Sequence, residues 1–229
     1  MGIYRDWFKS LPRSVEVVAM QYPGRGARFG EKSISSCDEM VSLLSENIIN
    51  FLDKPFIFFG HSSGALVSFE LARALQKHGP SVRQLHHFLA GRRAIHLPRS
   101  VAILHDLPDE QLIFELRRLG GTPEELLAEP EIMRVFLPIL RADFSIGERF
   151  KCTEMTPLRC SASLVFGKSD PGFSGEDIDA WHDLIDGEID NFGCAGGHFF
   201  INSCKAHVLS FVGNRIEQVL AGLHTVGVN

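Results

Sequence analysis

The feature that most constrains the fold of this chain is a short apolar run that passes through a glycine-rich turn directly into an amphipathic segment. Residues 55–59 (PFIFF) are typical of a buried strand, and residues 65–76 carry apolar side chains at helical spacing. Between them, residues 60–64 (GHSSG) fit the pattern G-x-S-x-G. This context predicts a serine on a sharp strand-to-helix turn, above the edge of a sheet. We expect that positions 60 and 64 are glycine because such a turn leaves no room for side chains there.

The other segments alternate between strand and helix patterns. Further strands are predicted at residues 15–20, 85–90, 162–166 and 188–192. Helices are predicted from a capping box at Ser36 through about residue 52, at residues 176–184, and around residues 211–220. Strands that alternate with helices favour an α/β fold with a mostly parallel sheet flanked by helices.

The stretch from about residue 107 to residue 150 departs from this alternation, because it shows helical patterns only. Helices are predicted to begin near Pro108, Thr122 and Pro130. A helical insertion in an α/β pattern is typical of a cap over an active site, since such sites lie at the carboxyl ends of the strands. No linker or repeat is visible, so we expect one domain over residues 1–229 with a helical cap at about 107–150.

A serine hydroxyl is a poor nucleophile at neutral pH and needs a base, which in turn needs an orienting acid. After a G-x-S-x-G turn, the acid and the base follow the serine in the order Asp or Glu, then His. Asp170 comes just after the predicted strand 162–166 and is the first candidate for the acid. Asp177 and Asp179 are rivals, but they lie in the helix-forming stretch that follows.

His198 has the position that the base requires. It follows the predicted strand 188–192 and a loop of small residues, 194–197 (CAGG). Glycines in that loop allow the imidazole to reach Ser62. The other histidines beyond Asp170 fall in helical stretches or in the tail.

The composition excludes several classes of function. There are 23 Lys and Arg against 28 Asp and Glu, and the formal net charge of −5 disfavours nucleic-acid binding through bulk positive charge. No run of about 18 apolar residues is present, so we expect no membrane-spanning helix. The five cysteines are scattered and form no C-x-x-C pair, which is typical of reduced thiols in a cytoplasmic protein. No motif for a metal or a nucleotide cofactor is found.

Five short segments carry a resemblance to a known family. They are residues 21–28 (QYPGRGAR), 58–65 (FFGHSSGA), 120–123 (GGTP), 140–143 (LRAD) and 196–200 (GGHFF). In these segments the chain resembles the type II thioesterases, freestanding α/β-hydrolases that serve polyketide and nonribosomal peptide synthetases. It is also similar to the medium-chain thioesterase of animal fatty acid synthesis. The first and last segments are more specific to this family than the G-x-S-x-G turn.

The resemblance implies hydrolysis of an acyl thioester whose acyl group is carried on the phosphopantetheine arm of a carrier protein. Ser62, Asp170 and His198 would be nucleophile, acid and base, and the backbone N–H of Ser63 would donate to the oxyanion. Beyond the phosphopantetheine of the carrier, no cofactor is implied. The expected partners are acyl or peptidyl carrier domains of a synthetase, with no role for nucleic acid or a membrane.

The predicted cap would be mobile and would line the channel for the acyl chain. The candidate lining residues are Leu112, Leu116, Met133, Phe136 and Leu137. The alternative is that these side chains only pack the cap against the body of the protein.

One departure from the family concerns the start of the chain. Related thioesterases begin with a strand and a glycine-rich turn ahead of the segment that matches residues 3–7 here. This chain starts about where that turn would end, so we expect the N-terminal strand between residues 15–20 and 55–59 to be missing. The second N–H donor to the oxyanion would be missing with it.

Two other functions are compatible with the same residues. A carboxylesterase or an acyltransferase would use the same serine, histidine and aspartate, and relative rates on thioester and oxyester substrates distinguish it. A truncated, non-catalytic homologue that only binds acyl carriers would not react with a covalent serine probe.

Overall fold

Four strands lie side by side in the order in which they occur in the sequence, and every neighbouring pair is parallel. The computed structural model describes residues 3–79, 82–99 and 101–226. Residues 1–2, the place expected for the end of a glycine-rich turn, lie outside this part. The strands are β1 (Phe56–His61), β2 (Gln84–Ala90), β3 (Ser161–Gly167) and β4 (Ile189–Cys194). Four of the five predicted strands are therefore confirmed, with small shifts at their ends.

The strand predicted at residues 15–20 is wrong. This segment is irregular backbone, and Val17, Val18 and Met20 are exposed. An alternating apolar pattern cannot hold a strand by itself, because the backbone N–H and C=O groups need a neighbouring strand to bond. Within the described residues, β1 pairs with β2 alone, so residues 15–20 join no ladder.

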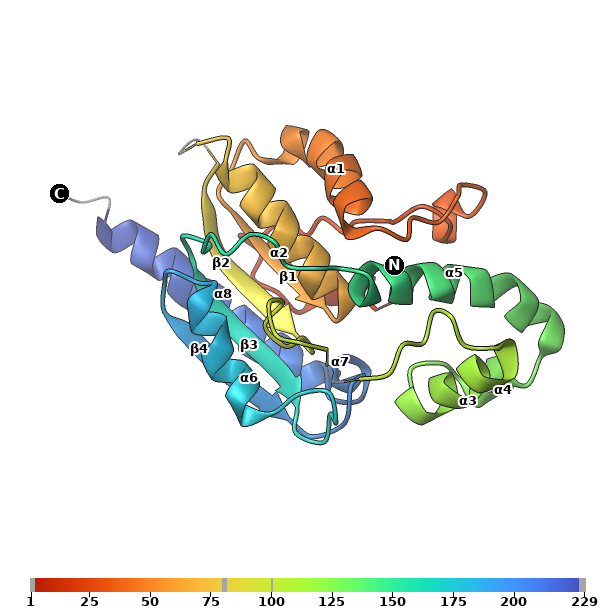
Figure 1. Cartoon of the computed structure of the whole chain (residues 1–229). Helices are drawn as coiled ribbons and strands as arrows, with labels where there is room; N and C mark the ends of the chain where they lie inside the picture. Colours follow the sequence, from red (N-terminus) through yellow and green to blue (C-terminus); the bar gives the residue numbers. More distant parts are fainter. Residues whose placement is uncertain (1–2, 80–81, 100, 227–229) are drawn as a thin grey trace.

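Helices cover both faces of the sheet (Figure 1). On one face α1 (Cys37–Ile48) packs against α2 (Ser63–Gln76), and α8 (Lys205–Val226) lies on the other. The shorter helices are α6 (Gly175–Asp179) and α7 (Phe200–Ser203), with 3₁₀ turns η1 (Trp7–Lys9), η2 (Gly26–Arg28), η3 (Ile49–Phe51) and η4 (Ala180–Asp183).

Two predicted helices end earlier than expected. Ser36 caps α1 by accepting the Glu39 N–H at 3.4 Å, as predicted, but α1 ends at Ile48 and only the 3₁₀ turn η3 follows. The helix predicted at residues 176–184 is divided between α6 and η4. In both places the chain tightens into a 3₁₀ turn at the helix end, a common way to satisfy the last backbone groups.

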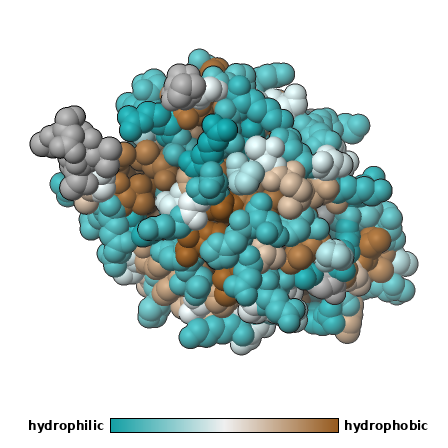
Figure 2. Space-filling view, turned by 60° about the vertical axis from the view of Figure 1, so that its left-hand side comes forward, coloured by the Kyte–Doolittle hydropathy of each residue, from teal (hydrophilic) through white to brown (hydrophobic). Residues whose placement is uncertain are grey.

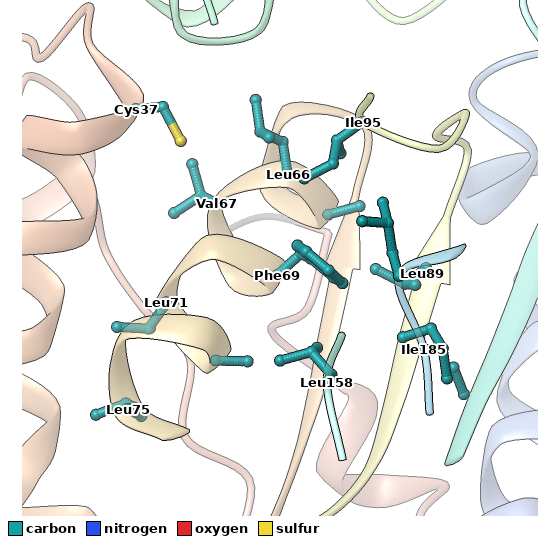
Figure 3. Close-up of a cluster of buried hydrophobic side chains, with 14 of the residues drawn as sticks. Cys37, Leu66, Val67, Phe69, Leu71, Leu75, Leu89, Ile95, Leu158 and Ile185 are labelled. Atoms are coloured by element: carbon teal, nitrogen blue, oxygen red, sulfur yellow. The ribbon is translucent and has the colours of Figure 1, made fainter. Parts of the chain in front are cut away.

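The strands send alternate side chains to two separate hydrophobic cores. Leu89 of β2 and Leu164 of β3 belong to the core beneath α1 and α2. Their sequence neighbours Phe88 and Val165 belong to the core beneath α8. Because both faces are buried here, residues 88–90 of β2 and 164–166 of β3 are consecutive apolar residues rather than alternating ones. Figure 3 shows the first core, where one face of α2 meets β2 and nearby segments; its labelled residues are Cys37, Leu66, Val67, Phe69, Leu71, Leu75, Leu89, Ile95, Leu158 and Ile185.

A helical insertion separates β2 from β3, within the stretch predicted to be only helical. It consists of α3 (Asp109–Leu119), α4 (Glu124–Leu127) and α5 (Pro130–Glu148), and we call it the helical insertion below. It projects away from the sheet in Figure 1. Five of its buried side chains form a third core: Leu112, Leu116, Leu127, Met133 and Leu137. Ile146, near the end of α5, belongs instead to the core beneath α1 and α2. The insertion therefore holds its shape largely by its own packing.

On the face shown in Figure 2, hydrophilic residues predominate and hydrophobic residues gather in a patch near its centre. Among the described residues, none of the helices is both long and apolar enough to cross a bilayer.

Two adjacent histidines of β2 are fully buried between the sheet and its covering helices. His86 lies 2.6 Å from Ser161 Oγ and 2.8 Å from Ser163 Oγ, and His87 Nε2 lies 2.9 Å from Ser68 Oγ. Burial lowers the pKa of each imidazole to about 3, so both are neutral in the folded protein. An unfolded chain would bind protons at these two sites near pH 6.5.

We expect the protein to lose stability in mild acid because of these two histidines. In the folded protein these imidazoles take up protons only near pH 3, whereas in the unfolded chain they take them up near pH 6.5. Acid therefore stabilises the unfolded state more than the folded state, and the free energy of unfolding declines as the pH falls below 6.5. Between pH 7 and pH 5 each histidine should remove about 2 kcal/mol of unfolding free energy. Chemical denaturation at both pH values measures this loss. In His86→Gln the pH slope should be smaller; an unchanged slope would assign the acid sensitivity to other groups.

Candidate active site

The turn after β1 holds Ser62 in a strained backbone conformation. Ser62 has φ 55° and ψ −119°, and among the described residues it alone combines a side chain with a positive φ. Its N–H donates to the carbonyl of Ala90 in β2 at 2.8 Å, and its own carbonyl accepts from the Ala65 N–H at 3.0 Å. The sheet on one side and α2 on the other therefore fix the strained residue, as in a nucleophile elbow.

The two glycines of this turn lack a side chain for different reasons. A Cβ on Gly60 would lie 2.4 Å from the Gly64 oxygen and 2.5 Å from Ser68 Oγ, so the turn has no space for one. A Cβ on Gly64 would meet nothing within 4 Å. The expectation of steric exclusion on both sides of Ser62 is thus right for Gly60 and wrong for Gly64, which lies in the first turn of α2 with open space where a Cβ would be.

The three residues that the sequence singles out for an active site lie together at the carboxyl edge of the sheet. His198 Nε2 lies 2.9 Å from Ser62 Oγ, and His198 Nδ1 lies 2.8 Å from Asp170 Oδ2. Ser62 follows β1, Asp170 follows β3 and His198 follows β4. When Nδ1–H donates to Asp170, the Nε2 lone pair faces the serine hydroxyl, which is the tautomer that a general base needs.

Glycines let the loops after β3 and β4 touch each other. A Cβ on Gly167 would lie 2.3 Å from the Gly197 oxygen, and Gly196 has a φ of 114° that favours glycine. The Ser169 N–H donates to the Gly196 carbonyl at 2.9 Å. These contacts place the loop of Asp170 directly beside the loop of His198.

Asp170 is ionised at neutral pH although its side chain is only 4% exposed. Burial by itself raises the pKa of Asp170, but the hydrogen bond and charge of His198 and the N–H of Gly172 lower it below its usual value. Oδ1 accepts from the Gly172 N–H at 2.9 Å, while Oδ2 faces His198. Both oxygens have partners, so the carboxylate keeps a fixed orientation toward the imidazole.

The rival acids Asp177 and Asp179 are placed elsewhere. Asp177 accepts from Arg93 Nε at 2.5 Å and from the Ser174 N–H at 2.6 Å, where it closes a capping box on α6. Asp179 is the last residue of α6. The structure therefore assigns Asp177 to a helix cap and an ion pair, and it pairs His198 with Asp170.

His61 also contacts the loop of His198, although the sequence pattern does not single it out. Its Nε2 lies 2.9 Å from the carbonyl oxygen of His198. Burial, together with the nearby charge of His198, lowers the pKa of His61 to about 4, so at pH 7 it is neutral and its Nε2–H donates. Gly91, with φ 58°, leaves room for this ring, since a Cβ there would lie 3.0 Å from Nε2. His61 occupies the first variable position of G-x-S-x-G, where the motif accepts any residue, so the sequence pattern could not predict this contact.

The five predicted channel residues lie in the helical insertion in two different environments. Leu112, Leu116, Met133 and Leu137 are buried in the core of the insertion, whereas Phe136 is 45% exposed. A hollow of about 340 Å³ lies between residues 102–107 and α3; it is lined by Ala102, Leu104, Leu107, Glu110, Gln111, Phe114 and Glu115. That the five residues line an acyl channel stays a prediction.

An ion pair that the sequence does not reveal joins the insertion to the body of the protein. Arg25 donates to both carboxylate oxygens of Asp143 in α5, at 2.5 and 2.6 Å, and its guanidinium lies 5.6 Å from the ring centroid of Tyr22. Each residue lies in a segment that carries the family resemblance, but 118 positions separate them. A bidentate pair of this kind fixes orientation as well as distance.

The chemistry available at this edge is acyl transfer through a covalent intermediate. The groups present are a hydroxyl on a strained turn, an imidazole and an ionised carboxylate in one hydrogen-bonded chain. No group of three or more His, Cys, Asp or Glu residues able to hold a metal ion occurs in the described part of the chain.

Comparison with known proteins agrees with this chemistry. The profile of the thioesterase domain family matches residues 2–216. The gramicidin S biosynthesis protein GrsT of Aneurinibacillus migulanus is 36% identical over 218 residues, which cover 95% of this chain and 85% of that protein. A Brevibacillus parabrevis protein named linear gramicidin dehydrogenase LgrE is 38% identical over 229 residues, or 99% of this chain and 87% of that protein. This chain has no G-x-G-x-x-G motif for a dinucleotide.

A solved structure extends the comparison to the fold. The type II thioesterase BorB from the borrelidin biosynthetic cluster superposes with a TM-score of 0.84 at 31% sequence identity. The match covers 93% of this chain and 86% of that one. The likeness therefore includes the sheet, the helices that flank it and nearly the whole length of the chain.

We expect a fluorophosphonate, which reacts with activated serines, to label Ser62 and no other serine. Ser62→Ala should abolish labelling, and Asp170→Asn should slow it roughly 10³-fold or more, because His198 would lose the partner that sets its tautomer. Labelling rates measured by mass spectrometry check this. Asp177→Asn is the matched control and should label at the normal rate. The reverse result, with Asp177→Asn slow and Asp170→Asn normal, would move the acid to Asp177.

Proposed function

This chain belongs to the thioesterase family, and from that premise we propose that it is a hydrolase that releases acyl groups from the phosphopantetheine arm of carrier proteins. The observation that carries the proposal is the hydrogen-bonded chain from Ser62 through His198 to Asp170 on a strained turn. Of the relatives named above, GrsT is a gramicidin S biosynthesis protein and BorB comes from the borrelidin biosynthetic cluster. We therefore assign the protein to editing or release in polyketide or nonribosomal peptide synthesis.

We propose a reaction in two steps, which the distances at Ser62, His198 and Asp170 support. His198 Nε2 takes the proton of the Ser62 hydroxyl as the oxygen attacks the thioester carbonyl, and the protonated imidazole then gives this proton to the departing thiolate, which leaves as the thiol. Next, His198 takes a proton from water, and the resulting hydroxide attacks the acyl-serine ester. The imidazole returns that proton to Ser62, and the free acid leaves. Asp170 stabilises the imidazolium in both steps.

The oxyanion of each tetrahedral intermediate needs N–H donors. Ser63 is the first residue of α2, and N–H groups of a first helical turn have no partner within the helix. The positive end of the helix dipole adds to the attraction. We therefore assign the Ser63 N–H as one oxyanion donor.

The helical insertion is the part that we propose as a cap over the acyl chain. It has a core of its own. It comes after β2 in the chain, and the last residue of β2, Ala90, bonds the Ser62 N–H. Arg25 holds its last helix to the body of the protein through Asp143. Since a thiol is a good leaving group, we assign choice of substrate to the cap and to carrier docking rather than to the triad.

The five cysteines are free, which supports a cytoplasmic location.

Two observations favour this function over the alternatives. A carboxylesterase or acyltransferase would share the triad, but the family profile that matches is that of thioesterases. A non-catalytic carrier-binding homologue would have no need for an imidazole 2.9 Å from the serine or for an ionised, oriented Asp170.

We expect an acyl group on a phosphopantetheinylated carrier protein to be hydrolysed with a kcat/KM at least ten times that of the matched oxyester. The physical reason is that carrier docking adds binding energy while the thiol leaves readily. Release of free acid, measured by chromatography, tests this for both substrates, with Ser62→Ala as the blank. Preference for the oxyester, or transfer to an alcohol or amine instead of water, would support the alternative enzymes.

Phe136 and Leu112 offer a matched pair for the predicted acyl channel. Phe136→Ala removes an exposed ring and should change the preference for acyl chain length while the melting temperature stays close to that of the parent. Leu112→Ala empties a fully buried site and should cost about 2–5 kcal/mol of stability. Rates on acyl thioesters from two to twelve carbons, with thermal melting, measure both effects. A chain-length profile unchanged in Phe136→Ala would remove Phe136 from the channel.

A further inference from the structure

A glycine of the helical insertion lies directly against an aromatic ring of the active site. At the end of α3, Gly120 takes the left-handed conformation, with φ 72°, that closes the helix. The next residue, Gly121, is not among the positive-φ glycines, so its backbone does not require glycine. A Cβ on Gly121 would lie 2.3 Å from both Cε2 and Cζ of Phe199. Only a residue without a side chain lets this ring pack against the turn between α3 and α4.

The same ring packs against His198. Phe199 is the next residue in the chain, and its ring stands edge-on to the imidazole, with centroids 5.3 Å apart and an interplanar angle of 90°. It is also 5.9 Å from the ring of His61, which donates to the His198 carbonyl. The backbone of Phe199 is held by the first turn of α7, because its carbonyl accepts from the Asn202 N–H at 2.9 Å. One ring therefore lies between the imidazole and the helical insertion.

The insertion can transmit a displacement to this ring. Leu116 of α3 and Leu127 of α4, on either side of the turn, are buried in the core of the insertion. At the far end of the insertion, Arg25 fixes α5 to the body through Asp143. Because the insertion is tightly packed within itself, its helices should move together about the anchored end of α5. The turn that carries Gly121 would move with them.

We propose that Phe199 is a positioning residue: its ring aligns the His198 imidazole with Ser62 while the turn at Gly121 is packed against it. The orientation of the base is then coupled to the position of the helical insertion over the site. This inference rests on the proposed function for its substrate, but the alignment of His198 with Ser62 is measurable without any substrate.

The test is a double-mutant cycle on Gly121 and Phe199. In Gly121→Ala the new methyl group overlaps the ring tip, so we expect kcat on an acyl thioester, and the rate of Ser62 labelling by a fluorophosphonate, to fall at least tenfold. Phe199→Leu removes the two atoms that lie 2.3 Å from the added carbon. Cδ2, at 2.7 Å, then becomes the end of a short flexible side chain that can turn away, so this change should cost only a few-fold. In the double variant, adding Gly121→Ala to Phe199→Leu should cost less than twofold, with KM unchanged throughout.

The matched control is Gly30→Ala. A Cβ at Gly30 would meet nothing within 4 Å, and this variant should keep the parent rates and melting temperature. Independent, multiplicative losses in the double variant would overturn the proposal, as would a normal labelling rate in Gly121→Ala. A protein that labels with this coupled pattern yet hydrolyses no thioester would overturn the proposed function and leave the coupling intact.

If Gly121→Ala does not fold, Phe199→Leu and Phe199→Ala carry the test on their own. The proposal requires kcat and the labelling rate to fall progressively from Leu to Ala while KM stays constant. A loss of melting temperature with both rates unchanged would show that the ring only packs, and would overturn the positioning role.

Discussion

The structure depends on the backbone of Ser62, which has a conformation that a residue with a side chain rarely adopts. Such strain persists only where the surroundings determine it from more than one side. Here the Ser62 N–H is bonded to Ala90 in β2, and its carbonyl is bonded within α2. The parallel pairing of β1 with β2 therefore positions the reactive hydroxyl, and the residue after Ala90 is the glycine that makes room for His61.

The rest of the site follows from this placement. In a parallel sheet all strands end at one edge, so the loops after β3 and β4 meet at the turn of Ser62. Close contact between those loops requires Gly167, where a Cβ would lie 2.3 Å from the Gly197 oxygen, and the loop of His198 also needs Gly196 for its φ of 114°. The two cores on either face keep the strands in register, and they involve none of the three site residues.

Much of the fold was predictable because its signals are local. Four strands, the capped α1 and the helical insertion each follow from periodicity and turn residues within short windows. The strand predicted at residues 15–20 failed for the opposite reason, since a strand exists only where a neighbour bonds its backbone. Steric exclusion at Gly64 failed because the direction in which a Cβ would point is set by the packed helix, not by the motif.

By itself the sequence determined most of the elements and their order, and it singled out Ser62 and His198, with Asp170 as the first of three candidate acids, as the residues to be brought together. Only the tertiary structure decided that Asp170, and not Asp177, faces the imidazole. It also decided the contacts that no motif announces, such as Gly121 against the ring of Phe199. The physical reason is that these contacts join residues far apart in the chain, and their geometry is set by how packed elements meet rather than by the preferences of neighbouring residues.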